Sequence, residues 1–376
     1  MKLIIIGGGI GGLATCLALE QIGIEATVFE RAERLETVGA GIGLAANATR
    51  VLQKLGLLED ILTHCGRMDW LEMKRHDGKL LKLVRLDNYE VPSVCVHRAV
   101  LLDVLQKNIL PERIKLSKTF QKFEQNGETV TAHFADGTAI ESDALIGADG
   151  LNSAVRSQLK GERQPVYRGY TVWRGVADFV PDNFQRGFTS ESSGAGRRFG
   201  WVPIGDGKIY WFATNNQPAD EQLAPAERKQ KVIELFGDWH SPLPETIAAT
   251  DENAILQNDC SDREPETGWA NGCVLLLGDA AHPTTPNMGQ GGCMALEDAV
   301  ILARILRNQS NLSDAFQLFE RERFARTKYV IEKSRKFGEV GQWQNPFAVG
   351  LRNLLTRVFP LVLMQKEQDK IHGFEA

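Results

Sequence analysis

The feature that most constrains the fold is a glycine-rich turn directly after an apolar run at the start of the chain. Residues 2–6 are mostly Leu and Ile, as expected of a buried parallel strand. A GxGxxG pattern follows at Gly7, Gly9 and Gly12 and leads into a helix-forming stretch at 13–19. The first glycine permits the turn, the second lets the backbone approach a pyrophosphate, and the third lets helix and strand pack closely. The sequence therefore predicts a dinucleotide site at the helix N-terminus.

An acidic residue at the end of the next predicted strand supports this interpretation. The strand covers 26–29 and ends in Glu30. A carboxylate at that point accepts hydrogen bonds from both ribose hydroxyls and repels a 2′-phosphate. The unit alone leaves FAD and NAD as alternative ligands.

In two later segments an apolar run is again followed by a turn that contains glycine, here with an aspartate beside it. The segment 143–156 contains Asp149-Gly150, and the segment 274–299 contains Gly278-Asp279. After Asp279 comes a Pro- and Gly-rich turn and then a predicted helix that begins near Gly292. Asp279 is suited to hold a hydroxyl-rich chain. N–H groups at the start of the helix stabilise negative charge on a nearby ring.

With these three segments in this order, the chain resembles the class A flavoprotein monooxygenases, the para-hydroxybenzoate hydroxylase-like group. Within that family the run 286–293 is similar to zeaxanthin epoxidase, whereas 169–175 and 197–203 are similar to bacterial urate hydroxylase-like proteins. The resemblance implies an α/β fold. In it, a Rossmann-like FAD-binding domain is interleaved with a mostly antiparallel β-sheet substrate domain, and C-terminal helices follow. It also implies FAD as the cofactor, with NADH or NADPH as the reducing co-substrate.

The resemblance further implies which residues hold FAD. Glu30, with Arg31 beside it, would bind the adenosine ribose, and Arg98 would lie near the diphosphate or ribityl chain. Segment 39–43 would run past the flavin ring, and Asp279 would bind the ribityl chain. The predicted cofactor-binding residues are Gly9, Gly11, Gly12, Leu13, Glu30, Arg31, Gly41, Gly43, Arg98, Asp149, Asp279, Gly289, Gly291, Gly292 and Cys293. A surface salt bridge is the alternative role for Arg98.

Other residues near these motifs have structural interpretations. Residues 289–293 would place N–H groups at the pyrimidine edge of the flavin, while the Cys293 side chain is expected to be a small buried group. Asp149 would support the FAD and NAD(P)H positions. His282 is expected to shape its loop, and Arg156 to make a helix-start or interdomain contact.

Residues 70–96 and 161–262 alternate in polarity and contain many aromatic side chains, which predicts strands of an antiparallel sheet. Asp77-Gly78 and Asp206-Gly207 predict hairpin turns. The predicted division is an FAD-binding domain at 1–69, 97–160 and 263–340, a substrate domain at 70–96 and 161–262, and a C-terminal helical segment at 341–376.

A substrate pocket is expected between this sheet and the flavin. Its candidate lining residues, each with a place in the hydrophobic core as the alternative, are Arg198, Trp201, Tyr210, Phe212 and Pro286. Arg198 and Tyr210 are the candidate catalytic residues, because urate hydroxylase-like proteins carry a functional Arg and Tyr at these points. Those proteins have an acid where this chain has Asn287. An amide lacks the charge of a carboxylate, which argues against urate as the substrate.

The implied activity is that of an FAD-dependent monooxygenase that uses NAD(P)H and O₂. It would hydroxylate or epoxidise a small aromatic, heteroaromatic or polyene substrate through a flavin C4a-hydroperoxide. No spacing typical of a metal site or a nucleophile elbow is visible, so the chemistry is expected to come from the cofactor. The alternatives are a flavin-dependent oxidase or reductase on the same scaffold, and a non-catalytic flavin-binding protein.

Composition and charge limit the possible partners and the cellular location of the protein. The formal net charge of −5 disfavours a nucleic-acid partner. Six cysteines with no CxxC pair indicate reduced, buried thiols. The N-terminus lacks the features of a secretory signal, and no long apolar run predicts a spanning helix, so a cytoplasmic location is expected. Residues 347–364 are rich in Leu, Val and Phe, which is consistent with peripheral membrane contact or with a helix packed on the protein. The sequence makes no prediction of oligomeric state.

Overall fold

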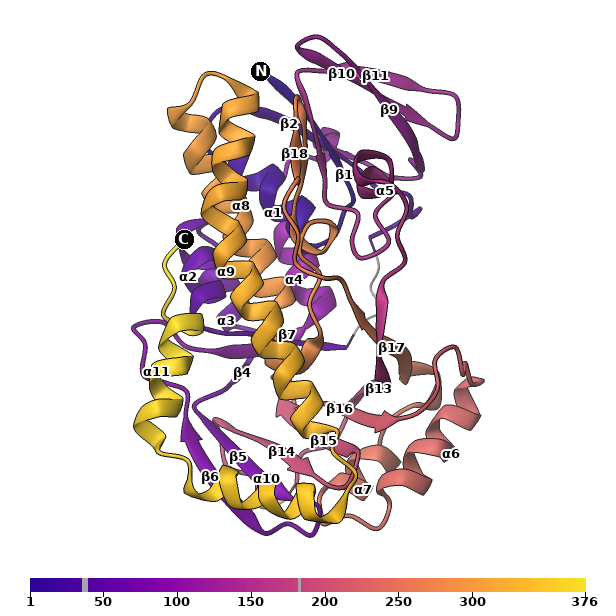
Figure 1. The fold of residues 1–376 in the computed structure, drawn as a ribbon, viewed down its shortest axis with the longest axis vertical. Helices are drawn as coiled ribbons and strands as arrows, with labels where there is room; N and C mark the ends of the chain where they lie inside the picture. The colour runs from indigo at the N-terminus through magenta and orange to yellow at the C-terminus, as the bar shows by residue number, and fades with distance from the viewer. Residues whose placement is uncertain (36–39, 182–183) are drawn as a thin grey trace.

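The computed structural model describes residues 1–35, 40–181 and 184–376, and two sheets organise this part of the chain (Figure 1). The first sheet has six strands, which are, in spatial order, β18 (Ala270–Asn271), β19 (Val274–Leu276), β12 (Ala144–Gly147), β1 (Lys2–Ile6), β2 (Glu25–Phe29) and β8 (Ile114–Lys115). All neighbouring pairs are parallel except β18 with β19. Strands β1 and β12 are Leu- and Ile-rich because a parallel sheet with covered faces buries both sides of each strand.

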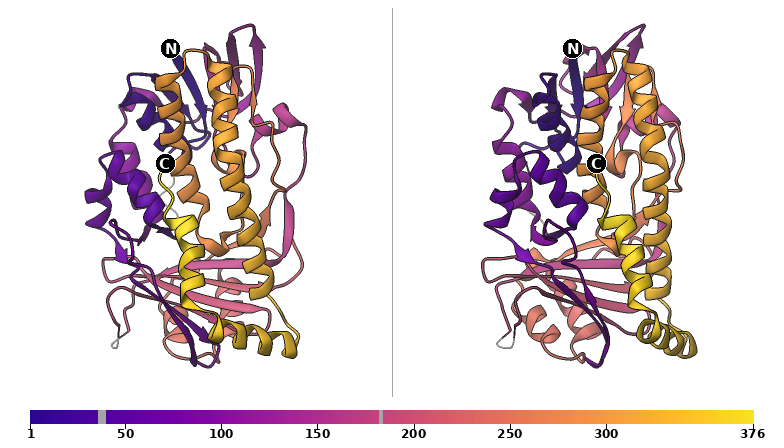
Figure 2. Two further views of the ribbon diagram at one scale, coloured as in Figure 1. Left: turned by 60° about the vertical axis from the view of Figure 1, so that its left-hand side comes forward. Right: turned by 90° about the vertical axis from the view of Figure 1, so that its left-hand side faces the viewer.

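Helices cover this sheet. Helix α1 (Ile10–Glu20) connects β1 to β2 and packs against α8 (Gly291–Asn308). The 30-residue helix α9 (Leu312–Gly341) lies beside α8 and continues to the second sheet (Figures 1 and 2). The other helices of this half are α2 (Ala46–Lys54), α3 (Leu58–Leu62), α4 (Arg98–Lys107), the short η1 (Pro111–Arg113) and α5 (Ala154–Lys160).

Two small sheets complete this half of the molecule. One has the order β3 (Gly41–Leu44), β7 (Val94–His97) and β4 (Gly66–Arg67), and the other β11 (Ala139–Ser142), β10 (Thr129–Phe134) and β9 (Phe120–Asn126). Strand β7 leads directly into α4. The first small sheet therefore fixes where Gly41, Gly43 and Arg98 lie relative to the main sheet.

The second large sheet has seven strands, which are, in order, β17 (Leu256–Asp262), β13 (Val166–Ala177), β16 (Ile209–Asn216), β15 (Arg197–Pro203), β14 (Phe188–Ser193), β5 (Trp70–Arg75) and β6 (Leu80–Arg85). All pairs are antiparallel except β14 with β5. The predicted turns at Asp77-Gly78 and Asp206-Gly207 are confirmed, since they join β5 to β6 and β15 to β16. The α/β class predicted from the sequence is also confirmed.

The two faces of this sheet have different roles. Trp173, Phe199 and Trp211 alternate onto one face and form a buried core with Phe236. Helices α6 (Pro225–Phe236) and α7 (Leu243–Ala248) and the short η2 (Glu252–Ala254) belong to this side. The intervening side chains point to the opposite face, toward the nucleotide-binding half.

Two helices follow α9 at the C-terminus. Helix α10 (Pro346–Val358) lies across the lower end of the molecule, and α11 (Leu361–His372) returns toward α2 (Figure 1). No single helix in the described ranges is long and apolar enough to cross a membrane, and α10 and α11 reach that length only as a pair bent by 89°.

Candidate active site

Glu30 and the three predicted glycine-containing turns each follow a strand of the six-stranded sheet. The Gly7–Gly9 turn follows β1, Glu30 follows β2, Asp149 follows β12, and Asp279 follows β19. These four strands are parallel, so their carboxyl ends share one edge of the sheet. Ligands of open α/β sheets bind at this edge.

The glycines of the first turn are needed for two different reasons. Gly7 has φ +110°, and a Cβ there would lie 2.5 Å from the Ala148 carbonyl oxygen. A Cβ at Gly12 would overlap the Gly7 carbonyl oxygen, so the helix packs on the turn only without a side chain. Gly9 differs, because its φ of −79° suits any residue and a Cβ there meets nothing within 4 Å. No contact within the described chain demands glycine at Gly9, whereas a phosphate against the helix N-terminus would.

Glu30 and Asp149 differ in how much of the hydrogen-bonding capacity of each carboxylate is used within the protein. Glu30 accepts from the backbone N–H of Gly8 (2.7 Å) and of Ala32 (2.9 Å), which holds its half-buried carboxylate at the strand end. Each oxygen keeps a further lone pair, as ribose binding requires. Arg31 beside it is exposed. Asp149 instead caps α5, accepting from Ser153 Oγ (2.5 Å) and Ala154 N (2.8 Å).

Asp279 lies in the short helix η3 (Gly278–Ala280) with its carboxylate exposed. It forms no hydrogen bond within the described part of the chain. Desolvation by the surrounding protein raises its pKa, while the nearby charges of His282 and Arg98 act in the opposite direction. Arg156 holds the loop by donating to the carbonyls of Ala280 (2.8 Å) and Ala281 (3.0 Å). An accessible carboxylate on an anchored loop fits a polyol chain such as ribityl.

Arg98 is the first residue of α4, and its backbone N–H donates to the Ala40 carbonyl oxygen (3.0 Å). Its side chain forms no ion pair with any described residue, so the surface salt bridge considered for it is absent from that part of the structure. The guanidinium is therefore available to an anionic ligand. Gly39, which was expected to run past the flavin ring, lies outside the described residues.

The second half of segment 274–299, which we call the third motif, begins helix α8, and α8 packs beside α1. The short helix η4 (Pro286–Met288) ends at Gly289, whose φ is +61°, and α8 starts at Gly291. A Cβ at Gly292 would lie 2.8 Å from Ile42 Cδ1, so α8 and β3 approach closely there. Cys293 is buried, and burial raises the pKa of its thiol to about 12. The thiol is therefore inert, as predicted.

A buried ionic cluster supports α8. Arg323 pairs with Asp298 (2.6 Å) and Glu297 (2.8 Å), and these three side chains are fully buried. His282 contacts Asp298 through Nε2 (2.7 Å), which agrees with the structural role expected for His282. Desolvation disfavours ionised Asp298, but the charges of His282 and Arg323 outweigh it and lower the pKa of Asp298 to about 2. Sequence reasoning missed this cluster, although Glu297-Asp298 inside an otherwise apolar helix is a signal of it.

Arg198 is buried on the face of the seven-stranded sheet that points to the nucleotide-binding half. Its guanidinium contacts Asn287 Oδ1, Glu191 Oε1 (3.3 Å) and Gln342 Oε1 (3.2 Å). Asn287 also hydrogen-bonds Tyr170 Oη (2.9 Å). Each guanidinium nitrogen thus already has a protein acceptor. Arg198 holds Asn287 in place, and its role as a catalytic residue stays a prediction.

Tyr210 also contacts the nucleotide-binding half, at strand β3. Its ring packs so closely on Gly41 that a Cβ at Gly41 would overlap it. Burial raises the pKa of Tyr210 to about 12, so the phenol keeps its proton at neutral pH. The hydroxyl forms no hydrogen bond with any described residue. A group with one free donor at this position is suited to bind a substrate oxygen.

The other candidate lining residues divide between the two faces. Phe212 lies on the same face as Tyr210, and its ring contacts that of Tyr210 at a centroid distance of 6.4 Å. Pro286 is exposed near the start of the third motif. Trp201 alternates onto the opposite face and is buried in the aromatic core, so the core interpretation holds for it.

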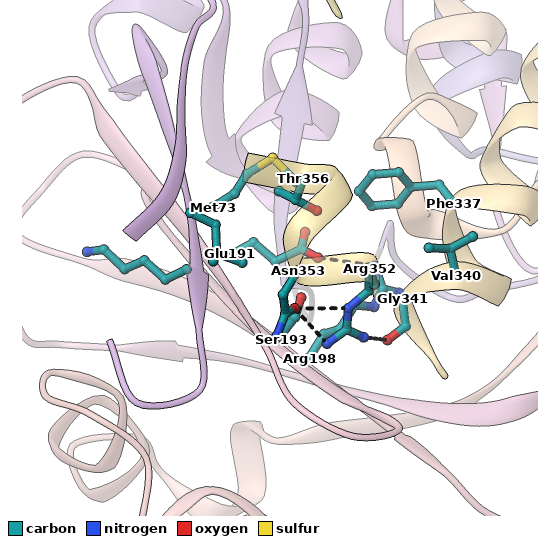
Figure 3. A pocket seen from close by; sticks show the side chains of 12 residues that line it. Met73, Glu191, Ser193, Arg198, Phe337, Val340, Gly341, Arg352, Asn353 and Thr356 are labelled. Atoms are coloured by element: carbon teal, nitrogen blue, oxygen red, sulfur yellow. Dashed lines mark hydrogen bonds and ion pairs between the residues drawn. The ribbon is translucent and has the colours of Figure 1, made fainter. Parts of the chain in front are cut away.

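A cavity lies on the other side of Arg198, between α10 and the seven-stranded sheet (Figure 3). It is lined by Met73, Lys74, Leu81, Glu191, Ser193, Arg198, Phe337, Val340, Gly341, Arg352, Asn353 and Thr356. Across the described ranges, no group of three or more His, Cys, Asp or Glu side chains is placed to hold a metal ion.

The fold and these motifs are those of an FAD-dependent oxidoreductase of the monooxygenase and hydroxylase class. Residues 1–334 match the model of the FAD binding domain family, and the chain belongs to that family. The class A flavoprotein monooxygenase resemblance, the FAD cofactor and the enzymatic character predicted from the sequence are thereby confirmed.

Relatives of known name support this assignment. Aurachin C monooxygenase/isomerase of Stigmatella aurantiaca is 40% identical over 95% of this chain and 94% of that protein. FAD-dependent urate hydroxylase of Klebsiella oxytoca is 32% identical over 89% of each chain. Chloroplastic zeaxanthin epoxidase of Solanum lycopersicum is 34% identical over 84% of this chain and 49% of its own length. The crystal structure of Klebsiella pneumoniae HpxO with FAD and uric acid has a TM-score of 0.92 and 27% identity, and it covers 99% of this chain and 96% of that chain.

Proposed function

We propose that this protein uses NADH or NADPH and O₂ to insert one oxygen atom into a neutral, planar aromatic or heteroaromatic substrate held at Tyr210. FAD, when bound, would supply the redox chemistry by which two electrons from NAD(P)H and one O₂ yield an oxygenated product and one water. The observation that carries this proposal is the contact of Tyr210 with Gly41. Through this contact a phenol that has no hydrogen-bond partner among the described residues lies where the seven-stranded sheet meets the nucleotide-binding half.

For FAD we propose that the pyrophosphate lies against Gly9 and the N-terminus of α1, with Arg98 supplying positive charge. Glu30 binds the adenosine ribose, and Asp279 binds the ribityl chain. The support is the space at Gly9, the accessible Asp279 carboxylate, and the Arg98 side chain, which forms no ion pair with a described residue. We further propose that backbone N–H groups at residues 289–293 face the pyrimidine edge of the flavin, where the positive end of α8 favours negative charge.

A neutral substrate is favoured by the charges around Arg198. Glu191 pairs with the guanidinium, Asn287 contributes no charge to the network, and the neighbouring cation Arg352 already donates to two backbone carbonyls. A buried cation that already has its partners gains little from a further anion. This argument favours an aurachin-like ring system over uric acid, in line with the 40% identity to aurachin C monooxygenase/isomerase.

A substrate screen tests the activity. We expect aurachin C or a related ring system to stimulate NAD(P)H oxidation more than uric acid, salicylate or zeaxanthin, with one labelled atom from ¹⁸O₂ in the product. Stimulated oxidation without label would identify an oxidase or reductase instead. Absence of stimulation across the panel would leave a non-catalytic flavin-binding protein.

The role of Tyr210 is tested by Tyr210→Phe, which removes only the hydroxyl. Losing one substrate hydrogen bond lowers kcat/KM by roughly tenfold to hundredfold, while the Kd for FAD stays unchanged. Tyr329→Phe is the matched control, because Tyr329 Oη bonds Glu367 (2.7 Å) between α9 and α11. Equal kcat/KM for Tyr210→Phe and the wild type would exclude substrate contact by the phenol.

A further inference from the structure

Helix α10 presents its polar side to the protein and its apolar side to solvent. Arg352 is buried and donates to the carbonyl oxygens of Gly341 (2.8 Å) and Gly194 (2.9 Å). Asn353 and Thr356 lie on the same side and line the cavity of Figure 3. The exposed residues of α10 include Phe347, Leu351, Leu354, Leu355 and Val358, with Phe347 90% exposed. A surface helix normally buries its apolar stripe, so the orientation of α10 is reversed.

The apolar surface continues around the bend into α11. Phe359, Leu361, Val362 and Leu363 are exposed where the two helices meet at 89°. We call the exposed apolar side chains between Phe347 and Leu363 the apolar corner. Contiguous exposed apolar surface of this kind marks an interaction site.

The charged side chains within the segment that carries the apolar corner are of one sign. Residues 340–366 contain no Asp or Glu. Arg357 and Lys366 are exposed there, and neither forms an ion pair with a described residue. Lys82 reaches the corner from β6, where its Nζ donates to the Phe359 carbonyl oxygen (2.9 Å). An apolar helix face bordered by cations is the pattern of helices that lie in the interface of an anionic membrane.

The same charges disfavour a second copy of the chain as the partner. In a symmetric dimer the same patch meets itself, so Arg357 and Lys366 of one protomer would approach those of its partner. The segment offers no acid to pair with them. Anionic lipids match both features of this surface, because their headgroup phosphates pair with the cations and their acyl chains cover the apolar side chains.

We propose that the apolar corner docks the protein peripherally on anionic lipid membranes, with Phe347 and Val362 among the side chains that enter the interface. This proposal does not depend on the identity of the substrate. It concerns binding alone, so its test is separate from turnover.

Co-sedimentation of the holoenzyme with vesicles tests the proposal. One set of vesicles is an equal mixture of phosphatidylethanolamine and phosphatidylglycerol, and the other is phosphatidylcholine alone. We expect binding to the anionic set and a loss of roughly tenfold or more in affinity for the double variant Phe347→Ser with Val362→Ser. The double variant Leu110→Ser with Val166→Ser, at exposed apolar residues outside the corner, is the matched control and should bind like the wild type.

A charge variant and two measurements on the free protein complete the test. Arg357→Gln with Lys366→Gln should weaken anionic binding and remove the preference over phosphatidylcholine. FAD content shows that each variant is folded. Wild type that stays in the supernatant, or corner variants that bind like wild type, would overturn the proposal. So would a dimer in solution that Phe347→Ser with Val362→Ser converts to a monomer while no vesicles bind, because a second copy would then cover the corner.

Discussion

Replacing Gly9 by alanine separates what the protein requires from what its cofactor requires. Gly9 has φ −79° and ψ −174° at the N-cap of α1, where alanine adopts the same conformation. A Cβ there meets no described atom within 4 Å. Alanine restricts the unfolded chain, which stabilises by about 0.4–1 kcal/mol, and it is a poorer N-cap than glycine by a similar amount. These effects nearly cancel, so the free energy of unfolding of the apoprotein should change by less than about 1 kcal/mol.

The effect of Gly9→Ala on the affinity for FAD should be larger than its effect on the free energy of unfolding. The added methyl group extends about 1.5 Å from Cα into the space proposed for the pyrophosphate, which moves the phosphates away from the N–H groups of α1. We expect the Kd for FAD to rise by roughly tenfold to hundredfold, or about 1.4–2.8 kcal/mol. Flavin fluorescence gives the Kd, and urea unfolding of the apoprotein gives the stability.

Two other glycines provide the comparison. Gly12→Ala should lower both apoprotein stability and FAD affinity, because its Cβ overlaps the Gly7 carbonyl. Gly350→Ala, at an open position of α10, should lower neither. Wild-type FAD affinity in Gly9→Ala would refute the placement of the pyrophosphate, and a large loss of apoprotein stability would refute the argument that the chain tolerates a side chain there.

Three further results are expected. Arg323→Ala leaves Asp298 buried with one cation fewer and should cost about 3–5 kcal/mol in urea unfolding, against less than about 1 kcal/mol for Arg304→Ala at an exposed pair. Burial, reinforced by nearby Arg side chains, lowers the pKa of His372 to about 4. The unfolded chain therefore takes up this proton first as pH falls, and up to about 3 kcal/mol of stability is lost between pH 6.5 and 4; a flat profile, or no change of slope in His372→Gln, would contradict this. Cys293 should react with an alkylating reagent only after unfolding, and native-state labelling seen by mass spectrometry would show that its thiol is not buried.

The nucleotide-binding half was the more predictable part, because its signals are local. A strand, a glycine turn and a helix within twenty residues define the unit around Gly9, and the acid at Glu30 follows from the next strand. Parallel strands bring their carboxyl ends to one edge, so Asp149 and Asp279 were expected near the same ligand. Asp149 lies at this edge as expected, but its carboxylate caps α5 by accepting hydrogen bonds from Ser153 and Ala154.

The substrate side was less predictable, because its contacts join distant parts of the chain. A strand alternates its side chains, but the sequence does not say which face meets the flavin. Arg198 and Trp201 lie on the same strand and point to opposite faces. The partners of Arg198 come from β14, η4 and the residue after α9, so no local pattern shows that its charge is already used.

The last turn of α9 lies directly on this network. A Cβ at Gly341 would lie 2.8 Å from Arg198 Cδ, and one at Gly338 would overlap the Asn287 amide. Each glycine therefore allows α9 to approach Asn287 and Arg198 closely. If this network shapes the substrate site as proposed, a single methyl group on α9 that shifts the amide or the guanidinium is expected to change selectivity while Tyr210, the residue proposed to contact the substrate, is kept.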